Sequence, residues 1–135
     1  MLLVTCLVLL FAAWPSAAVA KDGRGEVRVA GVCGRGATSQ LRLRSDDDGI
    51  ELRFEVEHNR KSVVWHVVLV HERRIAWKGA AKTTRSSGSF EVRRTLPDFP
   101  GADAVTARAL GPQGLVCRAS ATLPDPSSLP DSSSS

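Results

Sequence analysis

Tyrosine is absent from this chain of 135 residues, and its single methionine is Met1. With only three histidines and three cysteines, the side chains that bind soft metals are scarce, so we expect no metal site and no cofactor. The serines lie in no Gly-x-Ser-x-Gly motif, and no other pattern places a serine, a histidine and an acid together. The sequence therefore predicts a protein that is not an enzyme.

Blocks of like charge are missing as well. The chain carries 18 basic and 14 acidic residues, a net charge of +4, and the two signs alternate along it. Because no run of five or six basic residues occurs, the sequence predicts no nucleic-acid binding. A moderate positive charge favours weak attraction to anionic surfaces instead.

Long apolar runs are confined to the first twenty residues. Residues 2–14 are almost entirely apolar, but this run is shorter than the roughly 20 residues that a membrane-spanning helix needs. Ala18-Val19-Ala20 has the small-x-small pattern of a signal peptidase site. We expect residues 1–20 to be a signal peptide cleaved after Ala20. The mature protein is then secreted or otherwise extracytoplasmic, with no membrane span.

The dominant pattern in the remaining chain is alternation of apolar and polar residues. It lies between a short leader at residues 21–25 and a Pro/Ser-rich tail at residues 124–135, which we expect to be disordered. The alternating segments include 26–29, 41–44, 51–57, 90–93, 105–109 and 115–123. A period of two places one set of side chains on a buried sheet face. The sequence predicts an all-β, antiparallel β-sandwich over residues 26–123, with seven or eight strands.

Two cysteines remain once the predicted signal peptide, with Cys6, is removed. An even number of cysteines in an oxidising compartment predicts a disulfide between Cys33 and Cys117. Each is in phase with the apolar residues of its strand, so both thiols are expected to face the core. The bridge would join the first and last strands, which on the chain-entropy model contributes about 4–5 kcal/mol.

Several segments resemble strands of immunoglobulin and fibronectin-III sandwiches. Trp65-x-Val67-x-Leu69, the turn at 71–74 and Ile75-x-Trp77 resemble strands C and C′ of such domains. Residues 96–109 are similar to their E–F corner and strand F, and residues 114–123 to strand G. The resemblance, shared with small secreted bacterial sandwiches without an assigned function, implies an Ig/FN3-like fold. The chain departs from it by lacking the tyrosine corner and by placing its cysteines on the outermost strands.

Residues 63–70 form a predicted strand that is apolar on both faces. One of these faces carries Val64, His66, Val68 and Val70. If Val70 pairs directly with Ile75, Trp77 joins this face and makes it a candidate partner-binding patch. A one-residue bulge would instead turn Trp77 towards the face of Trp65. The alternative is a central strand whose outer face is shielded by the stems of Arg and Lys.

Two further candidates lie elsewhere on the sandwich. Arg108 and Arg118 are expected to point outward and, with Arg93 or Arg28, to form a small basic face, unless these charges are simply solvated. In the loop 96–101, two prolines flank Phe99 and could present it to an enzyme. The alternative is an ordinary corner with Phe99 buried.

Together these features predict an exported, non-catalytic binding or accessory module that acts outside the cytoplasm or at the cell envelope. Its partner would be an extracellular protein or an anionic envelope polymer. The alternative is a secreted inhibitor of an extracellular enzyme that presents the 96–101 loop.

Overall fold

The computed structural model describes residues 25–125. The predicted signal peptide, residues 21–24 of the predicted leader and residues 126–135 of the predicted tail lie outside the described residues. Within 25–125, no helix has the length and apolar character needed to cross a membrane.

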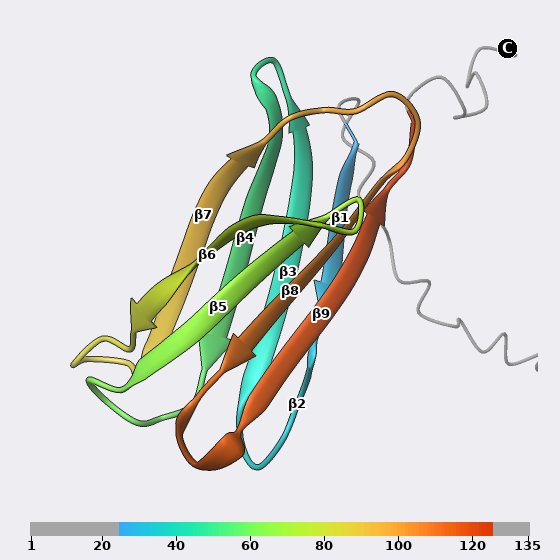
Figure 1. Cartoon of the computed structure of the whole chain (residues 1–135). Helices are drawn as coiled ribbons and strands as arrows, with labels where there is room; N and C mark the ends of the chain where they lie inside the picture. Colours follow the sequence, from blue (N-terminus) through green and yellow to red (C-terminus); the bar gives the residue numbers. More distant parts are fainter. Residues whose placement is uncertain (1–24, 126–135) are drawn as a thin grey trace, which may run out of the picture.

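The described chain is built almost entirely of β-strands, with one short 3-10 turn, η1 (Pro112–Gly114). The nine strands are β1 (Glu26–Ala30), β2 (Val32–Cys33), β3 (Thr38–Asp46), β4 (Gly49–Glu57), β5 (Val64–His71), β6 (Arg74–Lys82), β7 (Ser89–Leu96), β8 (Asp103–Leu110) and β9 (Val116–Leu123). They form two antiparallel sheets that pack face to face, as Figure 1 shows. One sheet has the order β1-β3-β4-β7 and the other the order β2-β9-β8-β5-β6. The predicted all-β antiparallel sandwich is therefore confirmed.

The core lies between the two sheets and is made by the apolar phase of the predicted alternation. Trp65 is fully buried; the ring of His58 meets it edge-on at 5.6 Å between centroids, and that of Phe90 lies at 5.8 Å. The other buried apolar residues include Leu41, Leu43, Ile50, Leu52, Phe54, Val56, Val67, Leu69, Val92, Val105, Ala107, Ala109, Ala119 and Leu123. Because each strand sends alternate side chains inward, the polar set of the same strands forms the two outer faces.

The N-terminal segment is divided between the two sheets, which explains why the structure has more strands than predicted. β1 pairs with β3, whereas β2 pairs with β9. The chain crosses at Gly31, where a Cβ atom would collide with the Ser39 hydroxyl and crowd the Arg118 carbonyl. Only glycine fits this close approach of three chain segments.

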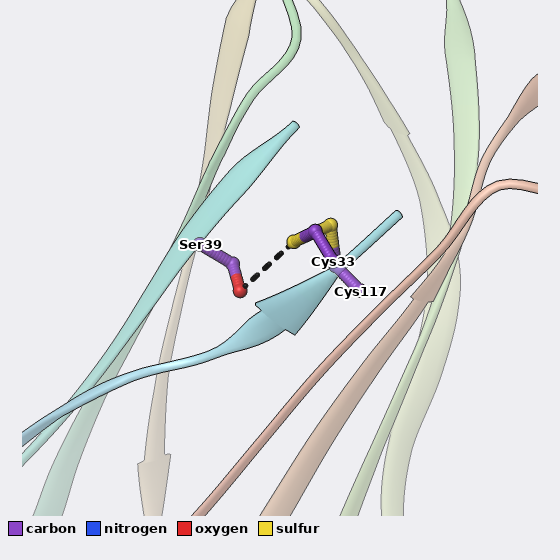
Figure 2. Close-up of a disulfide and its surroundings, with 3 residues drawn as sticks. All are labelled: Cys33, Ser39 and Cys117. Carbon is purple, nitrogen blue, oxygen red and sulfur yellow. Dashed lines mark hydrogen bonds between the residues drawn. A yellow bond between two sulfur atoms is a disulfide. The ribbon is translucent and has the colours of Figure 1, made fainter. Parts of the chain in front are cut away.

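The predicted disulfide is present and joins neighbouring strands of one sheet. Cys33 of β2 and Cys117 of β9 are direct cross-strand partners. Cys117 is fully buried, and Cys33 is partly buried. The Ser39 hydroxyl lies 3.3 Å from Cys33 Sγ (Figure 2) and donates to it, because a disulfide sulfur carries no hydrogen. The bridge thus ties an early strand to the last one, although Cys33 lies on the second strand and not the first.

The strand order agrees with the sequence-based assignment of strands C, C′, F and G. The segments that resemble strands G, F, C and C′ are β9, β8, β5 and β6, and they lie side by side in that order. In the other sheet, β3 and β4 are joined by the two-residue turn Asp47-Asp48 and stay neighbours. The strand before the segment that resembles strand C is β4, and it lies in the opposite sheet from β5, as strand B lies opposite strand C in immunoglobulin domains.

Candidate functional site

Trp77 does not lie on the predicted binding face, because β6 contains a bulge. Val70 pairs with Ile75, but the preceding residue, Leu69, pairs with Trp77, which leaves Ala76 as the extra residue. Trp77 therefore shares the inner face with Leu69 and packs against the core. The guanidinium carbon of Arg94 lies 4.2 Å from the centroid of its ring. The inclusion of Trp77 in the binding face was wrong, and the bulge alternative describes its position.

The other four residues of that prediction do share the outer face of β5. Val64 is 49% exposed, and His66 is also exposed. Val68 and Val70 are partly exposed, whereas the alternating Trp65 and Leu69 are buried. In β6, opposite Val70, Ile75 is 63% exposed and extends this apolar surface. His71, five residues after His66, faces the interior, as the strand period predicts.

Cross-strand pairing places two of the predicted arginines on this same face. Arg108 of β8 lies opposite Val68 on one side and opposite Arg118 of β9 on the other. Lys78 of β6 is the second neighbour of Val68, and Val32 of β2 is the second neighbour of Arg118. One row of side chains thus crosses all five strands. We define the cationic face as Val68, Val70, Ile75, Lys78, Arg108 and Arg118.

No carboxylate neutralises the cationic face among the described strands. Asp103 is the single acidic residue in the five strands of this sheet, and it is buried. Arg108 and Arg118 are directly opposed, and like charges in this position repel each other. An anionic group bound between them would relieve this repulsion. An open depression of about 630 Å³ lies on this face, bordered by Val68, Val70, Ile75, Thr106, Arg108, Val116 and Arg118.

The outer face of the four-stranded sheet is electrically different. Here Glu26 pairs with Arg28 and Arg42, and the pKa of Glu26 is lowered by the hydrogen bond from Arg28 and by the charges of both arginines. Arg93 also lies on this sheet, paired with Glu91, which raises the pKa of Arg93. The prediction that Arg93 or Arg28 joins Arg108 and Arg118 was therefore wrong, because both lie on the other sheet.

Phe99 packs against a buried, hydrogen-bonded histidine and aspartate at one end of the sandwich. His71 Nε2 lies 2.6 Å from Asp103 Oδ1, and both side chains are at most 3% exposed. The ring of Phe99 stacks on that of His71, with centroids 4.6 Å apart and an interplanar angle of 12°. The backbone N–H of Phe99 donates to Asp103 Oδ1 at 3.3 Å. Phe99 is thus 42% exposed, with its ring resting on the sandwich and its backbone tethered.

The same cluster contains the side chains best placed to hold a metal ion. His71, Glu72 and Asp103 bring ligand atoms within 4.8 Å of one another. Glu72 Oε1 also accepts a 2.6 Å hydrogen bond from the backbone N–H of Ala104, so these atoms already bond to the protein. The sequence does not reveal this cluster, because His71 and Asp103 are 32 residues apart. The sequence does contain one indication of it. His71 is in step with the buried residues of its strand, so its polar ring lies in the core and needs a hydrogen-bond partner.

Asp98 gives this end of the sandwich a testable pH dependence. Asp98 is exposed, yet partial desolvation of its carboxyl raises its pKa. The hydrogen bond with Asp103 and the charges of Asp103 and Asp125 act in the same direction, against the opposing effect of His71. A raised pKa in the folded state contributes stability below the unfolded pKa of about 3.9, and that contribution is lost as pH rises through the folded value. We expect Asp98→Asn to be more stable than the wild type at pH 7 and to show a smaller difference at pH 3. Urea unfolding at the two pH values measures this. Asp48→Asn, in the exposed β3–β4 turn, is the control, and an equal gain at both pH values would contradict the expectation.

Comparison with known proteins adds no family to this description. No protein-family model matches the chain, and searches among curated proteins and solved structures found no significant match.

Proposed function

We propose that this protein is an extracytoplasmic, non-catalytic binding module whose cationic face docks an acidic protein surface. The observation that carries the proposal is the row of Arg118, Arg108 and Lys78 across a sheet with no exposed acidic residue in its described strands. A disulfide suits an oxidising compartment outside the cytoplasm. We also propose that the protein is bacterial and that its sandwich is of the immunoglobulin or fibronectin-III type.

The apolar residues between the cations favour a protein over an anionic polymer. Val68, Val70 and Ile75 are exposed or partly exposed β-branched side chains, which lose little rotamer freedom on binding. Arginine beside an apolar centre is the composition that protein interfaces favour. A polyanion would need the cations alone, so these apolar side chains support a partner with an apolar centre and an acidic rim.

The inhibitor alternative finds less support in the geometry. An inhibitory loop must project a rigid side chain into the enzyme, whereas the ring of Phe99 lies flat on His71. The cationic face is therefore the better candidate for contact with a partner.

The test begins by capturing partners from secreted and envelope fractions at low and high salt, then purifying whatever protein is retained. We expect Arg108→Gln/Arg118→Gln to weaken its affinity at least about tenfold, since each arginine loses a charge-assisted contact. Val68→Ser is expected to weaken it by about fivefold through lost apolar contact. Surface plasmon resonance measures both changes.

The matched control is Arg28→Gln/Arg93→Gln, which removes the same charge from the opposite sheet and should change affinity by less than about twofold. An equal loss in this control would overturn the assignment of the face. Retention of a polymer that is abolished by salt and unaffected by Val68→Ser would overturn a protein partner. Failure to retain anything at either salt concentration would overturn the binding-module proposal.

A further inference from the structure

A cavity of about 500 Å³ lies at the end of the sandwich opposite the His71–Asp103 pair. Three loops border it, those between β2 and β3, between β4 and β5, and between β8 and β9. These loops lie at the lower end of the view in Figure 1. The residues that line the cavity include Arg35, His58, Arg60, Gln113 and Leu115. None of them belongs to the cationic face.

The cavity is positively charged. Arg35 comes from the β2–β3 loop and Arg60 from the β4–β5 loop, so the fold brings together two cations that are distant in sequence. None of the described residues that line the cavity is acidic. Neither arginine takes part in the ion pairs of the described residues. Two unneutralised guanidinium groups at a concave surface favour an anion, because planar guanidinium matches the geometry of oxyanions.

His58 adds a polar atom that the protein leaves unused. Its Nδ1 atom is buried and has no hydrogen-bond partner among the described residues. The ring is held by its edge contact with Trp65, and the backbone N–H donates to the Gly88 carbonyl at 3.2 Å. Buried polar atoms are normally paired, so the Nδ1 atom is an exception to that rule. The His58 ring forms part of the cavity wall.

The loops are held in a fixed and partly strained conformation. Arg35, Asn59 and Gln113 all have positive φ angles, of 38°, 60° and 57°, in the region that L-residues rarely adopt. Residues kept in such conformations by their surroundings concentrate at functional sites.

Contacts beneath the loops hold them in place. The buried hydroxyl of Thr83 donates to the Arg60 carbonyl at 2.6 Å and accepts from the Val63 N–H at 2.8 Å. On the other wall, the Gly34 N–H donates to the Val116 carbonyl at 3.3 Å. These two residues adjoin Cys33 and Cys117, so the disulfide of Figure 2 fastens the wall directly. A preorganised cavity of this kind loses little entropy when a ligand binds.

We propose that this cavity binds a small molecule that carries an oxyanion, as a carboxylate, phosphate or sulfate group. Arg35 and Arg60 pair with the anionic group, and Leu115 with Pro112 contacts the uncharged part of the ligand beside the His58 ring. Such a group occurs both in free small molecules and at the residues of acidic polysaccharides. A volume of about 500 Å³ falls within the usual range of small-ligand sites.

The test is a titration of the protein followed by ¹H–¹⁵N NMR, with inorganic phosphate, sulfate, glucuronate and neutral glucose as separate probes. We expect saturable shifts of the amides at 34–36, 58–60 and 113–115 with at least one anion, with dissociation constants of about 1 mM, and none with glucose. Arg35→Gln and Arg60→Gln should each weaken binding by about tenfold, the loss of one charge-assisted contact. Tighter binding of a glucuronate oligosaccharide than of glucuronate itself would show that the bound group belongs to an acidic polysaccharide and not to a free small molecule.

Arg73→Gln/Arg74→Gln, in the β5–β6 turn at the other end, is the matched control and should leave the shifts unchanged. Arg108→Gln/Arg118→Gln should leave them unchanged too, so this site can fail while the cationic face holds, and the reverse. Shifts that persist in Arg35→Gln/Arg60→Gln, or the absence of saturable shifts with every anion, would overturn the proposal. The native amide spectrum of each variant verifies that it is folded.

Discussion

Replacing Cys33 and Cys117 together by alanine is expected to lower the free energy of unfolding by about 4 kcal/mol. The bridge spans 84 residues of sequence, so it removes a large loop-closure entropy from the unfolded chain. It also fastens β2, a strand of two residues that has only two ladder partners in β9. Urea unfolding of the oxidised wild type and the double variant measures the difference.

Reduction of the disulfide in the wild-type protein provides the control for this experiment. Wild-type protein treated with a reductant should approach the stability of the double variant, whereas the double variant should not respond. Ser39→Ala, which removes only the hydroxyl beside Cys33 Sγ, should cost about 1 kcal/mol. A loss below about 1 kcal/mol in the double variant would contradict the cross-link argument.

Asp103→Ala is expected to destabilise the protein by about 3 kcal/mol. Asp103 is buried, pairs with His71 Nε2 at 2.6 Å and accepts from the backbone of Phe99. Its removal leaves the buried His71 ring without this partner and frees the β7–β8 loop from its tether. Buried groups that lose a partner are costly because water does not replace it. Thermal and urea unfolding measure the effect.

A double-mutant cycle separates this pairing from simple loss of volume. Asp103→Asn keeps an acceptor oxygen and should cost less than Asp103→Ala. His71→Leu/Asp103→Leu replaces the pair by apolar side chains and should be more stable than the sum of the single changes predicts. Additive single changes would show that the two side chains do not depend on each other.

The two ends and the two outer faces of the sandwich have opposite characters. At one end, His71, Glu72 and Asp103 bond to each other or to the backbone and close the structure. At the other end, Arg35, Arg60 and the Nδ1 atom of His58 are left without such bonds at a cavity. Ion pairs cover the four-stranded sheet, whereas the cationic face has none. Both candidate sites, the cationic face and the cavity, therefore carry positive charges that no carboxylate of the described residues neutralises. An anionic ligand or partner can neutralise them.

The alternation of apolar and polar residues is enough to predict which side chains enter the core. Because a strand has a period of two, Leu52, Phe54 and Val56 could be assigned to one face and their charged neighbours to the other. The phase of Cys33 and Cys117, together with their even number, likewise predicted the disulfide. The outward direction of Arg108 and Arg118 followed from the same alternation.

Which of these faces lie together depends on strand pairing, which alternation does not reveal. Alternation shows that Arg93 and Arg108 both point outward, but it does not show that they belong to different sheets. The bulge at Ala76 turns Trp77 inward, because one extra residue reverses every later side chain of a strand. The row of Lys78, Val68 and Arg108 depends on strand pairing, and the cavity on loops that meet in space. Local periodicity sets the side of a strand that a residue occupies, whereas pairing between distant segments sets its neighbours.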